Sequence, residues 1–448
     1  MKERKLTKTQ LKEAFKRGLG SSYIELKESN CCEKYKDIVL WACLRNTCYD
    51  MQCEGGRGTF LYNAIGLFED KSFFEEAIIH KFMQKNLDTW LFDQLCELLY
   101  LFAVDGSVRA REALYEKYNV LLGLLSHRVS HKEKGLLEWL CVWLTSLDGF
   151  PAFKKIVKQL GGHALSKRNK VDMDWFYSNG QNKFGDKRVD TYLQNNAMKS
   201  EAVKAFLNSV SHTTIQNGQS IDPPTLEELI KASKEKRNRG LALRFARIAL
   251  QEDLIKLAKY SIEETNPEIK LELLWTFRKV RFPLEEQFIF ELAESKNQAI
   301  RDTAFEMMKH LPPDMIHDYA LNLLKQKKET ANALSLLCYC YKPEDEVVLL
   351  EGIQSLEVSY KDGSWHGVFM DVEKLLDNRT VRISPACFTY IYRQTLCSYC
   401  RHTLILKMSK RKILPQEIIE ECLYDSYEDT RKFAVRKLRS QKIKSRER

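Results

Sequence analysis

The sequence predicts an all-α fold, an α-solenoid of stacked antiparallel helix pairs with an irregular central segment. Three observations lead to this prediction. A step of 31 residues repeats in the middle of the chain. Gly and Pro contribute only 19 and 10 of 448 residues, about half their usual combined share. Short stretches with apolar residues at helical spacing recur along most of the chain, and a fixed period of this size is typical of stacked helix pairs.

Helical periodicity fills residues 1–160 almost throughout, so this N-terminal region is predicted to be helical, with divergent repeats as an open possibility. The amphipathic patterns predict helices over 35–47, 73–84, 92–104, 108–118 and 133–147. Asp105-Gly106-Ser107 separates the third of these helices from the fourth.

Residues 161–224 are predicted to be an irregular insertion or a domain boundary, because turn-forming residues replace the apolar periodicity. The turn signals are Gly161-Gly162, Ser178-Asn179-Gly180, Asn217-Gly218 and Pro223-Pro224. The overlapping stretch 151–199 carries ten Lys or Arg against four Asp. Its aromatic residues lie among these charges: Trp175, Phe176, Tyr177, Phe184 and Tyr192.

The repeat array itself is predicted over residues 225–341. Arg239, Lys270 and Arg301 stand 31 residues apart, and apolar residues keep the same step around them. These are Ala242, Leu273 and Ala304; Leu257, Phe288 and Tyr319; Ala258, Ile289 and Ala320; and Ile262, Ala293 and Leu324. Each repeat is predicted as helix, turn, helix. Asn266-Pro267 and Lys296-Asn297 precede the second helix, where Asn can cap and Pro can begin it.

Residues 342–440 are predicted to be a C-terminal helical region that ends in a final repeat, followed by a basic tail at 441–448. The formal net charge of +10 lies mainly at the two ends of the chain. Residues 1–17 carry seven Lys or Arg against two Glu, and residues 431–448 carry nine against one. Terminal charge of this kind is often solvated tail, which weakens a whole-protein argument for nucleic-acid binding.

Two segments state the repeat most fully: Asn297-Gln-Ala-Ile300-Arg301-Asp-Thr-Ala304 and Tyr427-Glu-Asp-Thr430-Arg431-Lys-Phe-Ala434. In these segments the chain resembles HEAT-like repeat proteins, particularly the short-repeat variety of phycobilisome-lyase-like proteins. The resemblance covers 225–341 and 415–440, extends more loosely to 90–150, and does not include 161–200 or 343–385. It implies a scaffold with an extended surface for a partner, but a shared repeat does not carry a shared chemistry.

The repeated basic residues Arg239, Lys270 and Arg301 are candidate binding residues with two open interpretations. A cation near a helix N-terminus is unfavourable for the helix dipole, so each is expected to pair with an acid of a neighbouring repeat. The resemblance implies such a charge ladder between turns. The alternative is direct contact with a ligand.

A nucleic-acid-binding α-solenoid is the alternative function, using the basic stretches 151–199 and 231–247. Candidate residues in the second stretch are Lys234, Arg237, Arg244 and Arg247, which are near helical spacing. Basic grooves with exposed aromatic residues bind phosphates and stack bases. Solvated charge is the competing interpretation.

Two further clusters suggest local sites. Cys397 and Cys400, followed by His402, can hold half of a zinc site, with the remaining ligands from Cys338, Cys340, Cys387 or His366. Structural thiols or a redox pair explain the same spacing. Arg57 lies in the Gly-rich turn 53–58, beside Glu54. This turn predicts either an anion or peptide-terminus site or an internal ion pair, and it lacks the ending of a P-loop.

The sequence favours a non-enzymatic scaffold that binds a protein or peptide along the concave surface of 225–341. No Ser–His–Asp elbow, His-Glu-x-x-His or dinucleotide motif occurs in it. A remote alternative is a HEAT-like DNA glycosylase, suggested by Trp90, Asp93 and Trp275. No cofactor other than the possible zinc is expected. The chain has no signal-like or membrane-spanning stretch, so a cytoplasmic protein with reduced cysteines and no membrane partner is expected.

Overall fold

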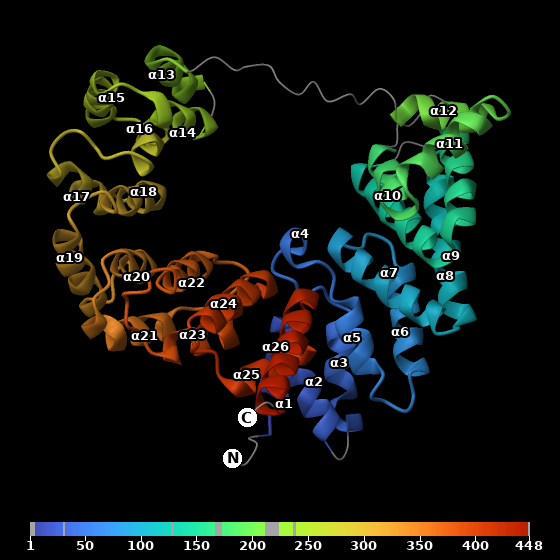
Figure 1. Ribbon diagram of the computed structural model, residues 1–448. Helices are drawn as coiled ribbons and strands as arrows, with labels where there is room; N and C mark the ends of the chain where they lie inside the picture. Colours follow the sequence, from blue (N-terminus) through green and yellow to red (C-terminus); the bar gives the residue numbers. More distant parts are fainter. Residues whose placement is uncertain are drawn as a thin grey trace. The chain divides into compact units, whose positions relative to one another are not determined.

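The computed structural model describes residues 5–29, 32–126, 130–165, 173–210, 224–235 and 239–446. Every regular element within these ranges is an α-helix or a short 3-10 helix, and no strand occurs among them (Figure 1). The all-α prediction is therefore confirmed. None of the helices in these ranges combines the length and the apolar character needed to cross a membrane.

The chain divides into two compact units. The first comprises Met1–Gln216, Leu396–His402 and Pro415–Arg448, and the second comprises Asn217–Thr395 and Thr403–Leu414. The first unit thus contains both the N-terminal and the C-terminal helices. Helix α24 (Ser398–Lys410) begins in the first unit and continues in the second.

The first unit has a long N-terminal series of helices and a short C-terminal group. Its helices are α1 (Lys8–Arg17), α2 (Gly20–Glu28), η1 (Cys32–Tyr35), α3 (Lys36–Cys43), α4 (Met51–Glu54), α5 (Gly58–Ile65), α6 (Ser72–Met83), α7 (Thr89–Val104), α8 (Val108–Leu124), α9 (His131–Leu165), α10 (Asp174–Phe184), α11 (Asp186–Ala197), α12 (Glu201–Val210), α25 (Gln416–Glu421), η4 (Cys422–Tyr424) and α26 (Glu428–Arg446).

Side-chain caps define several of these helix starts. Thr7, Asp88 and Ser107 each accept a hydrogen bond from a backbone N–H in the first turn of α1, α7 and α8. Such caps satisfy N–H groups that have no partner within the helix. The predicted break at residues 105–107 is therefore the turn that ends α7 and caps α8.

The second unit continues from α13 to α23 and includes most of α24. Its other helices are α13 (Leu226–Glu235), α14 (Arg239–Ile248), α15 (Gln251–Glu263), α16 (Pro267–Leu274), η2 (Trp275–Arg278), α17 (Gln287–Ala293), α18 (Gln298–Met308), α19 (Pro313–Lys325), α20 (Thr330–Tyr339), η3 (Pro343–Asp345), α21 (Glu346–Ser355), α22 (Ser364–Lys374) and α23 (Pro385–Gln394).

The predicted 31-residue repeat coincides with helix pairs in the second unit. Asn266 caps α16 with Pro267 at its first position, and Asn297 caps α18, as predicted. Two of the repeating apolar positions are buried in every copy, at most 1% exposed: Ala242, Leu273 and Ala304; and Ala258, Ile289 and Ala320. The periodic residues are thus those that pack between neighbouring helices.

The second helices of these pairs form a row. α14 contacts α16, α16 contacts α18, α18 contacts α20, and α20 contacts α22. The first helices α15, α17 and α19 each pack against the second helix of their own pair. Each pair therefore contacts mainly its neighbours in the chain, the packing that an array of helix pairs requires.

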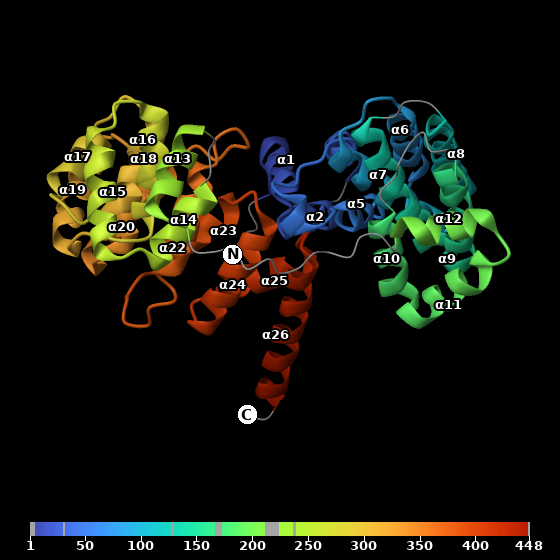
Figure 2. The ribbon, with the colours of Figure 1, turned by 90° about the horizontal axis from the view of Figure 1, so that it is seen from above.

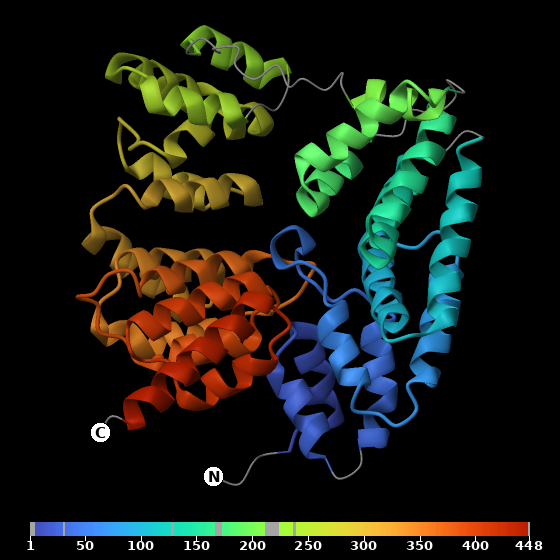
Figure 3. The ribbon, with the colours of Figure 1, turned by 45° about the vertical axis from the view of Figure 1, so that its right-hand side comes forward.

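The first unit has one continuous apolar core, which extends from Leu11 in α1 to Phe206 in α12. Figure 3 shows α8 and α9 as two long helices that lie side by side, and the two are in contact. α9 is two helical segments joined at Gly149, whose φ of 67° and ψ of −151° are not helical. Gly accepts this backbone conformation without the steric penalty of a side chain, and Pro151 then begins the second segment.

The segment 161–224 is more regular than predicted. Its described residues 173–210 hold α10, α11 and α12, and α12 packs along α9. The aromatic residues that seemed interleaved with charge produce this order, because Phe176 is 1% exposed and stacks on Phe153 of α9. Residues 166–172 and 211–223 lie outside the described ranges.

The C-terminal helices of the first unit pack against its first helices. α2 contacts both α25 and η4, and Tyr23 stacks on Tyr424 with 4.8 Å between ring centroids. Gly18 ends α1 with a φ of 67°, and a Cβ atom there would lie 2.1 Å from the Ser426 hydroxyl. Both its backbone angle and its surroundings therefore require Gly. α26 extends from this contact, and residues 439–443 are exposed (Figure 2).

A buried ion pair reinforces this contact. Arg401 and Asp425 are both fully buried, and the Arg401 Nε atom donates to the Asp425 carboxylate at 2.8 Å. Arg401 also donates to the main-chain carbonyls of Arg17 and Gly18 at 2.9 and 3.1 Å. This guanidinium therefore connects α24 with η4 and with the end of α1.

We expect Asp425→Ala to lower the free energy of unfolding by about 3 to 5 kcal/mol, because it leaves the Arg401 charge buried without its partner. Denaturant unfolding of the full chain measures this change. Asp429→Ala is the matched control, since the Asp429 side chain is 57% exposed and its ion pair with Lys432 should contribute at most about 1 kcal/mol. Equal losses in the two variants would contradict a stabilising role for the buried pair.

Candidate functional site

A hollow of about 540 Å³ opens beside the row of second helices in the second unit. It lies at the C-terminal ends of η2, α18, α20 and α22, and we call it the α18–α22 hollow. Its lining includes four basic residues, two acids and two tyrosines: Arg278, Lys279, Lys309 and Lys374; Glu306 and Asp371; Tyr339 and Tyr341. Basic side chains at helix C-termini interact favourably with the helix dipole.

Alternating charges connect the helices around this hollow. Glu306 of α18 lies 4.0 Å from Arg278 of η2 and 2.6 Å from Lys309. Lys309 also lies 3.8 Å from Asp371 of α22, which pairs with Lys374 at 2.8 Å. Ser335 of α20 donates a hydrogen bond to the same Asp371 carboxylate. Residues from η2, α18, α20 and α22 thus form one chain of polar contacts.

Three titratable groups of the hollow keep one protonation state near neutral pH. Burial raises the pKa of the Cys338 thiol well above its usual range, so this thiol stays protonated and unreactive. The hydrogen bond from Lys374 to Asp371 raises the pKa of Lys374, which keeps it cationic. Burial lowers the pKa of Arg278, although an arginine stays charged at neutral pH. The hollow therefore presents fixed charges.

Two of the three repeated basic residues pair with an acid farther along the chain. Arg239 lies 3.6 Å from Glu272 of α16, and Arg301 donates to Glu329 at 2.7 Å, immediately before α20. Lys270 instead donates to the carbonyl of Ile262 at 3.4 Å and makes no ion pair within the described ranges. The pairing interpretation thus applies to Arg239 and Arg301, while a ligand contact by any of the three stays a prediction.

The predicted basic stripe of 231–247 is only partly a surface feature. Lys234 and Arg247 are exposed, and the Lys234 ammonium lies 5.5 Å from the Tyr260 ring centroid. Arg244 is half-buried, and its Nε atom is inaccessible to solvent. Arg237 lies outside the described residues. Among the described candidates of the stripe, Arg244 is therefore less accessible than Lys234 and Arg247.

The binding role considered for Arg57 is wrong, because the Gly-rich turn encloses an internal ion pair. Arg57 is 2% exposed and lies 3.0 Å from Glu54, which is also buried. The guanidinium donates further hydrogen bonds to the Lys16 carbonyl at 2.6 Å and to the Thr47 hydroxyl at 2.9 Å. Glu54 in turn accepts from the backbone N–H of Ser398. These partners leave Arg57 no free surface for an anion.

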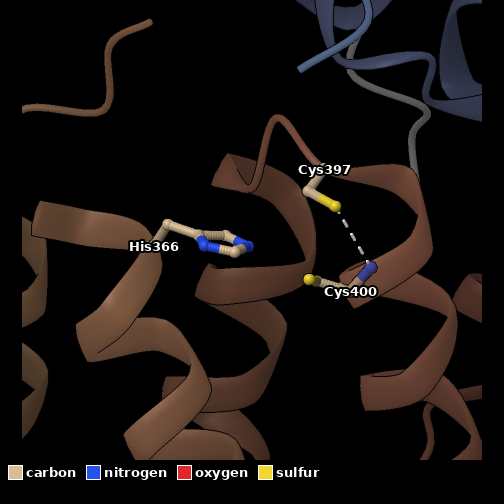
Figure 4. A group of neighbouring side chains, drawn as sticks. All are labelled: His366, Cys397 and Cys400. Carbon is tan, nitrogen blue, oxygen red and sulfur yellow. Dashed lines mark hydrogen bonds between the residues drawn. The ribbon is translucent and has the colours of Figure 1, made fainter. Parts of the chain in front are cut away.

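Cys397 and Cys400 lie together at the start of α24 (Figure 4). The backbone N–H of Cys400 donates to the Cys397 sulfur at 3.4 Å, so Cys397 caps the helix. Their sulfur atoms lie within 4.8 Å of each other. His366, also labelled in Figure 4, belongs to α22 of the second unit. The pair within the first unit supplies two ligand atoms, fewer than the three or four of a zinc site, so zinc stays a prediction.

The aromatic residues of 151–199 are buried or half-buried within the fold. Phe176 is buried, and Phe184 packs against Phe150 with 5.2 Å between ring centroids. Trp175 packs edge-on against Trp139, and the Tyr177 hydroxyl donates to Asp190 at 2.6 Å. These side chains stabilise the packing of α9, α10 and α11, which leaves the basic residues without the exposed aromatics that the prediction required.

The residues that suggested a glycosylase have structural surroundings within their own units. Asp93 of α7 is only 6% exposed and accepts a hydrogen bond from the Trp143 indole at 2.7 Å. Trp90 is 38% exposed at the first turn of the same helix. Trp275 belongs to the second unit, where the guanidinium carbons of Arg239 and Arg278 lie 4.3 and 4.0 Å from its ring centroid. Asp93 therefore has a structural partner and little access to a substrate.

Sequence reasoning missed the residues of the α18–α22 hollow, although one signal for them was present. Arg278 and Lys309 are separated by the same 31-residue step as Arg239 and Lys270. This second basic series marks the C-terminal ends of the second helices, just as the first marks their N-terminal ends. Asp371 has no such signal, because the repeat fades after residue 341.

The chain matches no protein-family model and no curated protein. The HEAT-like resemblance thus depends on the repeat residues themselves and stays a prediction.

We expect Asp93→Asn to stabilise the protein at alkaline pH. Burial is the main reason that the pKa of Asp93 rises from 3.8 to about 6, and the nearby Glu97 raises it further. The Asp93 carboxyl group therefore binds its proton more tightly in the native state than in the unfolded state. Its contribution to stability is complete below about pH 4 and is lost as the pH rises to about 6. Ionisation then costs about 1 to 3 kcal/mol. The amide avoids that cost and still accepts from Trp143.

Chemical unfolding at pH 4 and pH 8 measures the effect. The free energy of unfolding of Asp93→Asn should exceed that of the parent chain at pH 8 and equal it at pH 4. Glu112→Gln, a change at an exposed position of α8, should leave the pH dependence unaltered. A parallel shift of both variants would refute the assignment to Asp93.

Proposed function

We propose that the protein is a non-enzymatic scaffold that binds a protein partner at the α18–α22 hollow and along the adjacent row of second helices. The observation that carries the proposal is the lining of this hollow, in which fixed charges of both signs surround exposed Tyr339. Tyrosine and arginine are frequent among residues that dominate binding energy at interfaces. A volume of about 540 Å³ accommodates a few side chains of a partner.

The hydrogen-bonding state of the hollow supports binding over catalysis. Ser335 donates directly to Asp371, without an imidazole between them, so its hydroxyl lacks the adjacent base that a nucleophilic serine needs. A ring nitrogen of His310 lies 3.2 Å from the carbonyl oxygen of Arg278. Most of the charged groups of the lining are thus held in place by neighbours in the same unit. A prearranged surface lowers the entropy that a partner loses on binding.

The partner expected from this lining presents both acidic and apolar groups. Lys279 is exposed and makes no ion pair among the described residues, and Tyr339 at the end of α20 is 57% exposed. An acidic side chain of the partner can pair with Lys279, while an apolar one packs on the Tyr339 ring. The alternating pairs Glu306–Lys309 and Asp371–Lys374 would fix its orientation.

The experiment is affinity capture from a lysate, with and without nuclease, using the full chain and the double variant Tyr339→Ala/Lys279→Glu. We expect a protein that the parent chain captures and the variant loses by about tenfold, because an aromatic contact and a charge pair are both removed. The control Met315→Ala/Lys328→Glu makes the same kinds of change at α19 and the turn that follows it, away from the hollow. Retention by both variants, or capture that nuclease abolishes, would overturn the proposal.

A further inference from the structure

A second hollow in the second unit has a different chemistry from the first. It encloses about 740 Å³ at the C-terminal end of α24 and the turn after α22. Five cations line it, with one acid and one buried leucine: Arg379, Lys407, Lys410, Arg411 and Lys412; Asp377; and Leu376. We call it the α24 basic hollow.

Two of its five cations are held in place by bonds to neighbouring residues of the same unit. Lys407 lies 3.0 Å from Glu373 and 2.8 Å from Asp377, both of the α22 region. Arg411 donates to the main-chain carbonyls of Asn378 and Val381 at 2.9 and 2.7 Å. These bonds attach the turn 377–381 to the end of α24, and they determine where Arg379 lies.

The other three cations are available to a ligand. Arg379, Lys410 and Lys412 are exposed, and none makes an ion pair with any described residue. Subtracting the one acid from the five cations of the lining leaves four positive charges. Such a concentration of like charge is unfavourable by itself and is relieved by a bound anion.

The backbone at Lys412 determines where this cation lies in the hollow. α24 ends in a Schellman motif, in which Ile413 N–H donates to the Met408 carbonyl at 3.0 Å and Lys412 N–H to the Ser409 carbonyl at 3.1 Å. Lys412 occupies the position of this motif that usually holds Gly, with a φ of 61°. A lysine adopts this left-handed conformation only at a conformational cost. The same motif ends α19, with Lys327 at a φ of 54°, so the left-handed lysine by itself does not mark a site. In the hollow the motif fixes the point from which the Lys412 side chain extends.

We propose that the α24 basic hollow binds the phosphate backbone of a nucleic acid, without reading its sequence. Recognition of phosphates needs cations and no apolar anchor, which is the composition of this lining. A protein interface would need aromatic or apolar anchors at its centre, and the only apolar member of this lining, Leu376, is 4% exposed. Anionic membranes also attract clusters of cations, but stable anchoring there adds a buried apolar group, and the only apolar residue of this lining is already buried in the fold. This inference does not depend on the proposed protein-binding function.

The test is fluorescence anisotropy of a short labelled DNA duplex of mixed sequence with the full chain, over a range of salt concentrations. We expect affinity to fall steeply with salt, because bound phosphates release counterions. Arg379→Glu/Lys410→Glu should weaken binding at least about tenfold and reduce the slope of log affinity against log salt by about 2, one for each lost contact.

The control Lys259→Glu/Lys296→Glu makes the same change in net charge at exposed positions of the same unit outside the hollow. It should retain most of the affinity. Equal weakening in both variants would mean that only the overall charge and the basic ends of the chain attract DNA, and would overturn the proposal. Absence of duplex binding, or binding only to vesicles of anionic phospholipid, would overturn it as well.

Lys412→Gly distinguishes a role in binding from a role in folding. Gly relieves the left-handed backbone, so the melting temperature should rise while affinity for the duplex falls severalfold. A variant that is more stable and binds as well as the parent chain would show that Lys412 does not contribute to binding.

Discussion

Two buried ion pairs, Arg401–Asp425 and Arg57–Glu54, join the N-terminal helices of the first unit to its C-terminal helices. Buried charges are tolerated only when their remaining hydrogen-bonding groups are also satisfied. Arg401 meets this condition through the carbonyls that end α1, and Glu54 through the Ser398 backbone. The first helices of a repeat array would otherwise expose an apolar face. Here α25 and η4 pack on α2, so the C-terminal helices cover part of the N-terminal helices.

Charge also organises the second unit, although these contacts are more exposed. Arg301–Glu329 connects successive helix pairs near the N-terminal ends of α18 and α20, and Arg278–Glu306 does so near the C-terminal ends of η2 and α18. Single pairs of this kind contribute little to stability. We infer that these ion pairs set the register between neighbouring helix pairs. The helix pairs are held together by buried residues such as Leu273 and Ala304. The same side chains give the surface its alternating sign.

The two hollows of the second unit differ in how far acidic residues neutralise their basic residues. In the α18–α22 hollow, Glu306 and Asp371 neutralise much of the positive charge, and a tyrosine is exposed, which suits a polypeptide of mixed character. In the α24 basic hollow, Asp377 is the single acid, and three cations have no ionic partner among the residues described. That imbalance suits a polyanion. We therefore propose the two hollows as separate sites, one for a protein and one for a nucleic acid.

The sequence by itself determined the helical class, the caps at Asn266 and Asn297, and the buried positions of the repeat, because these depend on local periodicity and on short-range hydrogen bonds. It also identified Arg239 and Arg301 as members of charge pairs. Only the tertiary structure decided that Arg57 is buried, that Phe176 belongs to the core, and that residues 396–402 and 415–446 pack with the N-terminal helices. The first and third of these outcomes depend on contacts between residues hundreds of positions apart, such as Ser398 with Glu54. The second depends on Phe153, a residue of a different helix. A periodic pattern specifies which face of a helix is apolar, but not which distant helix will cover it.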